Sequence, residues 1–304
     1  MIPNSLVAFL CAALAAAGNA VANVMQRKAS LEESPDRAFD ARVMLDLVRN
    51  LTWVLGFLGM VTSFVLQGVA LGLGQLSAVE PVITLEVPLT ILIASHVFST
   101  RIGRVEWTGI ALMTGGMIAL VASLDPQPGD AYHVTNAEYV KAGGSTAFTI
   151  LALVVVGSRS RPVVRTAAIG AAAGTSFGLT ATLLKEAVTQ LNKRGLIGLV
   201  STWQTYAVVG FGLLGILLMQ AALHAGPLIA AQPGFTLMDP IVSILWGVLV
   251  YDEVTRTGWW LLLATLSAIA VGVGVFRLAK SPLFEEVSTS ESAERGADVR
   301  SSAS

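Results

Sequence analysis

The sequence predicts an all-α, polytopic membrane protein of about nine transmembrane helices arranged as two inverted structural repeats. Of its 304 residues, 54% are hydrophobic and 13% are charged, about half the charged fraction of a soluble domain. The charges lie between apolar runs of about 17–25 residues, the length that a helix needs to cross the hydrocarbon of a bilayer. One apolar passage interrupted by proline occurs twice, as in transporters built from two halves.

The spans follow from the length of the apolar runs and from the charged segments between them. We place the runs at about residues 3–25, 51–73, 77–98, 105–124, 142–158, 164–184, 203–224, 228–250 and 257–278. No Lys or Arg precedes the first run, so we interpret it as a retained span rather than a cleaved signal peptide. The segment 26–50 is too charged to cross, and apolar residues at helical spacing in its second half predict a short surface helix. Residues 125–141 form a polar loop, and we expect residues 279–304 to be a disordered cytoplasmic tail.

The duplicated passage defines the repeats. Residues 70–88 and 222–240 are identical at 9 of 19 positions when aligned at an offset of 152. An Ala-Ala-Ala-Gly run in span 1 recurs in span 6, so spans 1–4 correspond to spans 6–9. Because five spans separate each matched pair, an odd number, the copies are expected to be inverted in the membrane. The chain then divides into a first repeat (1–124), a linking segment with span 5 (125–163), a second repeat (164–278) and the tail (279–304).

Orientation follows from the distribution of basic residues between the two sets of loops. The loops and tail on one side carry twelve Lys and Arg residues near the membrane, and the opposite loops carry five. Because the cytoplasmic side holds the excess, we expect a multi-pass protein of the cytoplasmic membrane with its N-terminus outside and its C-terminus inside.

Several passages carry a resemblance to a known family. They are GNAVANVMQRK from Gly18 to Lys28, the segment Leu66–Pro88, GTSFGLTATLLK from Gly174 to Lys185, and PIVSILWGVLVYDE from Pro240 to Glu253 followed by Gly258. With these passages the chain resembles the drug/metabolite transporter superfamily, of the EamA-like kind. The nearest branch is the NIPA-type magnesium transporters, which the nine spans and the polar 26–50 link also resemble. The resemblance implies a helical permease of inverted repeats and Mg²⁺ as one candidate substrate.

Three acids inside the spans are the first candidates for a substrate site. Charges at bilayer depth cost roughly 2.5–3.5 kcal/mol each, so each calls for an explanation. Glu80 lies near the outer end of its span, where an interfacial role that reaches water is as plausible as a functional one. Glu86 and Asp239 each stand near a proline, Pro88 or Pro240, that loosens the backbone and frees a carbonyl one turn earlier. Carboxylates beside free carbonyls suit a hard cation such as Mg²⁺; alternatively, the acids titrate with protons or only hold helices together.

The neutral polar residues inside the spans form a second tier of substrate-binding candidates. They are Asn19, Asn23, Gln67, Thr84, Gln220, Gln232 and Thr236. Interhelical hydrogen bonds explain such residues equally well. The helix-breaking prolines are Pro81, Pro88, Pro233 and Pro240.

These observations predict a secondary transporter that moves a small solute, with a divalent cation first and Glu86 and Asp239 as candidate metal ligands. The alternatives are a small-metabolite or drug exporter, and a non-transporting membrane component of envelope assembly. No phosphate-binding loop or nucleophile–base pattern is evident, so we expect neither an enzyme nor a cofactor. The expected partners are the solute and the bilayer, without nucleic acid, and the chain is compatible with a homodimer.

Overall fold

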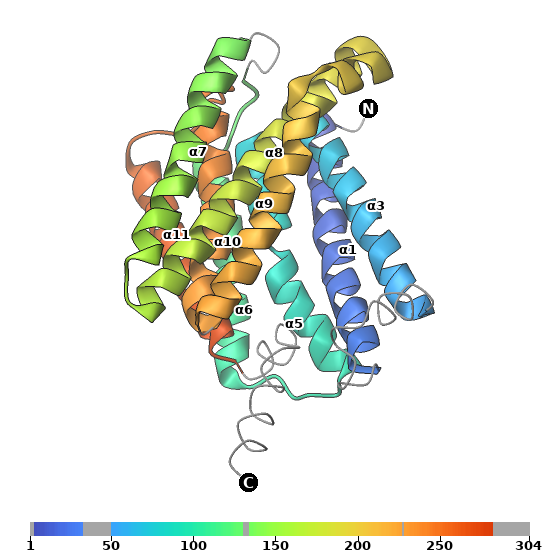
Figure 1. Ribbon diagram of the computed structural model, residues 1–304, viewed down its shortest axis with the longest axis vertical. Coiled ribbons are helices and arrows are strands. Elements are labelled where there is room, and N and C mark those ends of the chain that lie inside the picture. The colour runs from blue at the N-terminus through green and yellow to red at the C-terminus, as the bar shows by residue number, and fades with distance from the viewer. Residues whose placement is uncertain (1–2, 33–49, 130–133, 227, 282–304) are drawn as a thin grey trace.

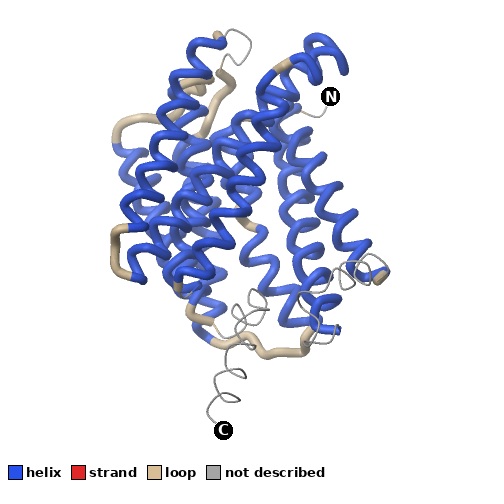
Figure 2. Tube along the Cα trace, viewed as in Figure 1, coloured by secondary structure: helices blue, strands red, loops and turns tan. Residues whose placement is uncertain are grey.

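The computed structural model describes residues 3–32, 50–129, 134–226 and 228–281, and within these ranges every regular element is a helix (Figures 1 and 2). The elements are α1 (Asn4–Glu32), α3 (Leu51–Leu73), α4 (Leu76–Ile83), α5 (Glu86–Val97), α6 (Arg104–Leu124), α7 (Asn136–Ser158), α8 (Pro162–Ser201), α9 (Trp203–Ala225), α10 (Leu228–Leu249) and α11 (Trp259–Ala279).

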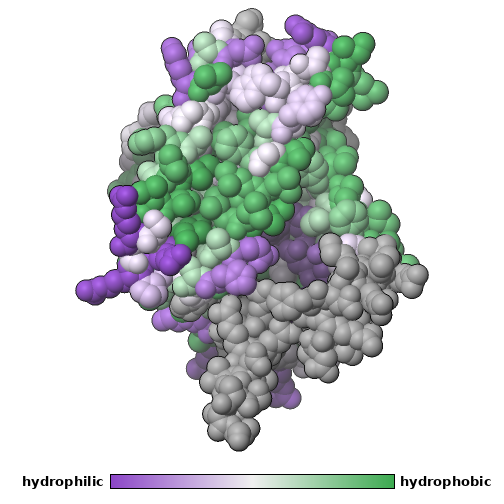
Figure 3. Space-filling model, in the orientation of Figure 1, coloured by the Kyte–Doolittle hydropathy of each residue, from purple (hydrophilic) through white to green (hydrophobic). Residues whose placement is uncertain are grey.

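The bundle has the surface of a membrane protein. Eight helical segments are long and apolar enough to cross a bilayer, with α4 and α5 together counting as one of them. Helix α10, with 22 residues and Asp239 as its single charge, fills the remaining predicted run. Figure 3 shows apolar side chains over the middle of the visible face and hydrophilic ones gathered toward its two ends. The prediction of an all-α, multi-pass membrane protein is therefore confirmed.

Three predicted spans have different bounds in the structure. Helix α1 continues to Glu32, seven residues beyond the expected end at residue 25. Helix α8 continues to Ser201, well beyond the expected end at residue 184, and bends at Gly195, whose φ is +66°. Helix α7 begins six residues early because Thr135 and Glu138 form a capping box at its start. The predicted surface helix and tail lie almost entirely outside the described residues.

The two proline-containing passages differ in shape. The first is interrupted: α4 ends at Ile83, and α5 begins at Glu86 with Pro88 in its first turn, where the missing N–H of proline costs little. The second passage stays helical through Pro233 and Pro240. Pro240 has no N–H to donate to the carbonyl of Thr236, so the helical ladder of α10 is weakened there.

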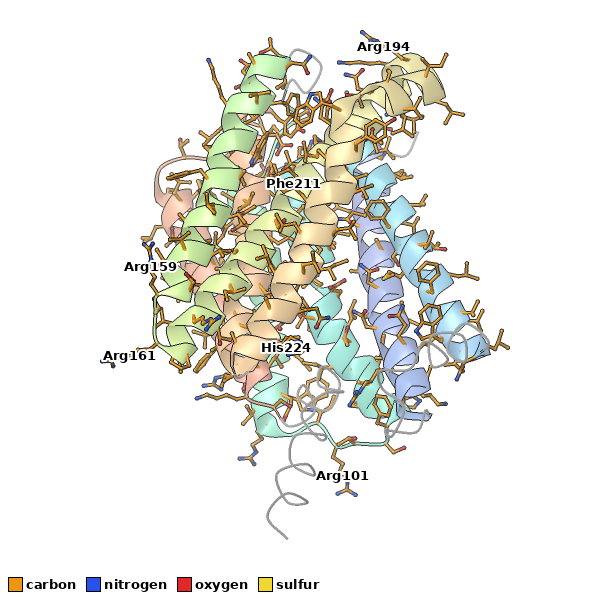
Figure 4. All side chains as sticks on the ribbon, viewed as in Figure 1. Arg101, Arg159, Arg161, Arg194, Phe211 and His224 are labelled. Carbon is orange, nitrogen blue, oxygen red and sulfur yellow. The ribbon has the colours of Figure 1, made fainter. Side chains whose placement is uncertain are left out.

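The helices run between two ends, which we call upper and lower as oriented in Figure 1. Arg194 marks the upper end, and Arg101 and Arg161 lie toward the lower end (Figure 4). Helices α1, α5, α9 and α11 run downward, whereas α3, α6, α8 and α10 run upward (Figure 1). Helix α1 packs along α3, α8 packs along both α9 and α10, and α6 packs along α11.

Glycines allow α8 to approach α10 closely. A Cβ added at Gly170 would lie 2.5 Å from the carbonyl oxygen of Ala231 and 2.9 Å from its Cα. Gly174 and Gly178, one and two turns further, meet the α10 backbone in the same way. This row fixes the position of α10, and with it that of Asp239.

We expect Gly170→Ala to lower the free energy of unfolding by about 1–3 kcal/mol, because the opposing atoms are backbone and cannot move aside cheaply. Gly143→Ala in α7 is the matched control, since no described atom lies within 4 Å of its added Cβ. Thermal unfolding of the purified protein in detergent measures both. Equal changes in the two variants would contradict the close α8–α10 approach.

Candidate functional site

Glu80 lies at the centre of the candidate site. Its side chain extends from α4, and only 1% of the residue is exposed. Gln67 of α3 donates from Nε2 to Oε1 of Glu80 at 3.0 Å, and Thr84 donates to the Glu80 backbone carbonyl at 3.0 Å. The interpretation of Glu80 as an interfacial residue that reaches water is therefore wrong, because the residue is almost completely buried.

Glu86 stands one short break after Glu80, at the first position of α5. An acid in the first turn of a helix is favoured by the helix dipole. The side-chain amide of Asn19, from α1, donates a hydrogen bond to the Glu86 carboxylate. Asn19 is thus the predicted polar residue that the structure joins directly to Glu86.

Asp239 completes the group of acids from the other half of the chain. It interacts electrostatically with both Glu80 and Glu86, so three carboxyl groups from α4, α5 and α10 come together. Its Oδ1 is shielded from solvent and has no hydrogen-bond partner among the described residues. Such an unpaired buried acceptor normally costs stability, so its presence points to a missing partner. We call Glu80, Glu86 and Asp239 the acid cluster.

Other predicted residues are placed differently. Gln220 and Asn23 are exposed on the outside of their helices, and nothing in the structure joins them to the acid cluster. Gln232 is buried and donates to the hydroxyl of Thr236 at 2.9 Å. This bond favours the alternative that the two residues stabilise the helices over the alternative that they bind substrate. Of the predicted neutral residues, Gln67, Thr84 and Asn19 contact the acids or their backbone. Thr90, which was not predicted, also donates to the backbone carbonyl of Glu86 at 2.7 Å.

The acid cluster does not form a ready-made metal centre. Across the described parts of the chain, no three His, Cys, Asp or Glu residues are arranged to hold a metal ion. A cation bound by Glu86 and Asp239 would take its remaining ligands from amide oxygens, backbone carbonyls or water. Mg²⁺ is often bound in this way, through one or two carboxylates with several retained waters.

A second polar group lies at the upper end, which sequence patterns did not reveal as a site. Glu253, from the segment after α10, accepts hydrogen bonds from the backbone N–H groups of Leu76 at 2.6 Å and Ser77 at 3.0 Å. Lys185 of α8 donates to the carbonyl of Gly74 at 2.6 Å, and its Nζ lies 3.9 Å from Oε1 of Glu253. We call this arrangement the upper interlock.

Two tyrosines and Glu186 adjoin the upper interlock. The hydroxyl of Tyr139, from α7, donates to Glu186 Oε2 at 2.7 Å and lies 3.2 Å from the hydroxyl of Tyr251. Burial raises the pKa of Tyr251, so its hydroxyl stays protonated and donates to the carbonyl of Thr182 at 2.8 Å. Lys185 and Glu186 were missed as site residues because the predicted span ended at residue 184, just before them.

A cavity of about 250 Å³ lies between α7, α8 and α10. Hydroxyl groups of Ser145, Thr146 and Thr149 line one side, and apolar residues of α10 line the other. Trp246 donates from Nε1 to Thr146 at 3.1 Å across it. None of the three acids lines this cavity, so it is separate from the acid cluster.

Comparison with known proteins adds one relative. The chain is similar to an uncharacterized protein of Corynebacterium glutamicum, with 26% identity over 264 residues that cover 84% of this chain and 89% of the relative. No family model matches the chain. No solved structure matches it either.

Proposed function

We propose that this chain is a secondary transporter that moves a small cation across the cytoplasmic membrane by alternating access, with Mg²⁺ as the first candidate. The observation that carries the proposal is Asp239, whose buried Oδ1 has no hydrogen-bond partner among the described residues and which interacts electrostatically with two further acids inside a membrane-spanning bundle. Ionisable residues at such depth line substrate or ion pathways when they are not simply paired.

The arrangement of helices supports two inverted repeats, residues 1–124 and 164–278, joined by α7. The alignment at offset 156 matches α1 with α8, and the alignment at offset 152 matches α3 with α9, α4 and α5 with α10, and α6 with α11. The packing of α1 on α3 and α5 then corresponds to the packing of α8 on α9 and α10. Each matched pair runs in opposite directions (Figure 1). In such transporters the substrate binds between the repeats near the midplane. The acid cluster combines residues of both repeats, Glu80 and Glu86 from the first and Asp239 from the second.

The charge distribution supports an orientation with the lower end in the cytoplasm. Arg101 and Arg161 lie toward that end (Figure 4), and Lys28 and Arg277 belong to helix ends on the same side. Under the rule that positive residues stay inside, the N-terminus is then outside.

Cation binding is tested first by thermal stability. Mg²⁺ added at about 100 times its dissociation constant is expected to stabilise the wild-type protein by about 2.7 kcal/mol, whereas NaCl at equal ionic strength leaves it unchanged. The variant Glu86→Gln/Asp239→Asn is expected to lose this response. Glu138→Gln, at an exposed acid of the upper end, is the matched control and keeps it. Flux of the same variants in proteoliposomes then tests transport.

A small organic cation is the second candidate substrate. It is favoured because no three His, Cys, Asp or Glu side chains among the described residues are arranged to hold a metal ion, and an organic ammonium group needs fewer ligands than a metal ion. Stabilisation by organic amines but not by Mg²⁺ would select this candidate. No response to either, together with no flux, would leave a non-transporting membrane component.

A further inference from the structure

The upper interlock begins with a cap supplied from far along the chain. Both carboxylate oxygens of Glu253 accept backbone N–H groups at the start of α4, and Oε2 also accepts the hydroxyl of Ser77. The first N–H groups of a helix have no partner within the helix, and negative charge is favoured there. Glu253 is 3% exposed. A residue of the second half therefore holds the first turn of a helix in the first half.

Lys185 holds the other side of the same break. Its Nζ donates to the carbonyls of Leu71 at 3.1 Å and Gly74 at 2.6 Å, where α3 ends. The last carbonyls of a helix lack helical donors, and a cation is favoured there. Lys185 is 7% exposed and faces Glu253. The ion pair thus spans the junction of α3 with α4.

The backbone of α10 packs closely against Glu253 and Ser77 at Gly247. A Cβ added at Gly247 would lie 3.0 Å from the carboxylate carbon of Glu253 and 3.2 Å from Cβ of Ser77. Glu80 follows Leu76 by four residues, about 6 Å along the axis of α4. Whatever moves the start of α4 therefore moves an acid of the candidate site.

The lower end does not repeat this arrangement. At an offset of 152, the position that matches Glu253 is Arg101. Spans 1 and 6 align at an offset of 156, which matches Lys185 with residue 29. The nearest cation is Lys28, one position away. Arg101 and Lys28 are both exposed, and the Arg101 side chain points away from the bundle (Figure 4). Two cations repel each other, so Arg101 and Lys28 cannot form an ion pair like that of Glu253 with Lys185 at the upper end.

We infer that Glu253 and Lys185 are positioning residues that form the upper gate: they hold α4 against α10, close access to Glu80 from the upper side, and separate when that side opens. The inference rests on the proposed function, because a gate matters only to a transporter. The charge-assisted hydrogen bonds at its centre are among the stronger ones that proteins form. Their loss in the open state is offset when water solvates the two charges.

The gate is tested by accessibility of a reporter thiol, which needs no substrate. The native Cys11 is first changed to Ser, and Leu76→Cys, which keeps its backbone N–H and is fully buried, becomes the reporter. Glu253→Gln is expected to raise the rate of labelling by an impermeant maleimide from the upper side by about tenfold or more, since each 1.4 kcal/mol shifts an equilibrium tenfold. Lys185→Met is expected to act in the same direction.

The matched control is Glu106→Gln. Glu106 is also a buried acid, but it lies at the lower end, where Oε1 accepts the Ser281 hydroxyl at 2.8 Å. This variant is expected to leave labelling at position 76 unchanged. Unchanged labelling in Glu253→Gln, or an equal rise in Glu106→Gln, would overturn the gate whether or not the protein transports. Faster labelling without any flux would keep the gate contact and reject transport.

A cross-link keeps the test valid if the charge variants do not fold. Ser77→Cys with Gly247→Cys, again without Cys11, places two Cβ atoms close to the separation of roughly 3.5–4.5 Å that a disulfide spans. The new side chain at position 247 displaces the Glu253 carboxylate, so the disulfide replaces the contacts of Glu253 as the link between α4 and α10. Oxidation is expected to join α4 to α10 and to stop flux, and dithiothreitol is expected to restore it. Failure of the folded protein to cross-link, or full flux after cross-linking, would overturn the inference.

Discussion

Lys185→Met is expected to lower the free energy of unfolding by about 3–5 kcal/mol, the usual cost of removing one partner of a buried ion pair. The replacement leaves Glu253 buried without its cation at 3.9 Å. It also takes away the donor to the carbonyls of Leu71 and Gly74. Methionine has a similar length, so the loss is electrostatic rather than a cavity. Thermal unfolding in detergent, with the wild type in the same buffer, measures the change.

A surface ion pair supplies the control for this prediction. Nη2 of Arg256 lies 2.7 Å from Oδ2 of Asp125, a shorter contact than that of Lys185 with Glu253, but the two side chains are 43% and 45% exposed. Exposed pairs contribute about 0–1 kcal/mol. Arg256→Met should therefore cost less than about 1 kcal/mol. Comparable losses in the two variants would mean that burial does not set the strength of the Lys185 contacts.

The spans could be predicted because the bilayer imposes their length and polarity on each segment separately. Helices α3, α6 and α11 begin and end within two residues of the predicted bounds. Helix α8 differs because a local pattern treats Lys185 and Glu186 as the start of a loop. Their partners, Glu253 and Tyr139, come from other helices or loops, and such distant pairs leave no trace in a hydrophobicity pattern.

The candidate site was partly predictable from the internal alignment. Glu86 and Asp239 fall on adjacent repeat positions, and the structure brings them together with Glu80. Gln220 lies away from the acid cluster, for a reason of helix geometry. The exact match of Gln67 is Met219, so Gln220 lies one residue further, about 100° around the helix axis. That rotation turns it to the outside of the bundle, whereas Gln67 binds Glu80.

Asp239→Asn is expected to remove the response to the cation while raising the stability of the unliganded protein by about 1–3 kcal/mol. The range is the usual cost of a buried acceptor without a partner. Asparagine has the same shape, carries no charge to be repelled by Glu80 and Glu86, and brings an amide that donates to carboxylates. Sites built to bind a ligand are often destabilised without it. Thermal unfolding with and without Mg²⁺, followed by flux, measures both effects.

Ser243→Ala is the control for this last prediction. Ser243 lies one turn after Asp239 on α10, is fully buried, and also has an oxygen without a partner among the described residues. Its removal changes no charge, so stability should change less and the cation response should remain. A less stable Asp239→Asn protein, or one that keeps its full response, would contradict the assignment. If Asp239 destabilises the protein without its cation because it is there to bind that cation, the Asp239→Asn variant must show both a gain in stability and a loss of binding.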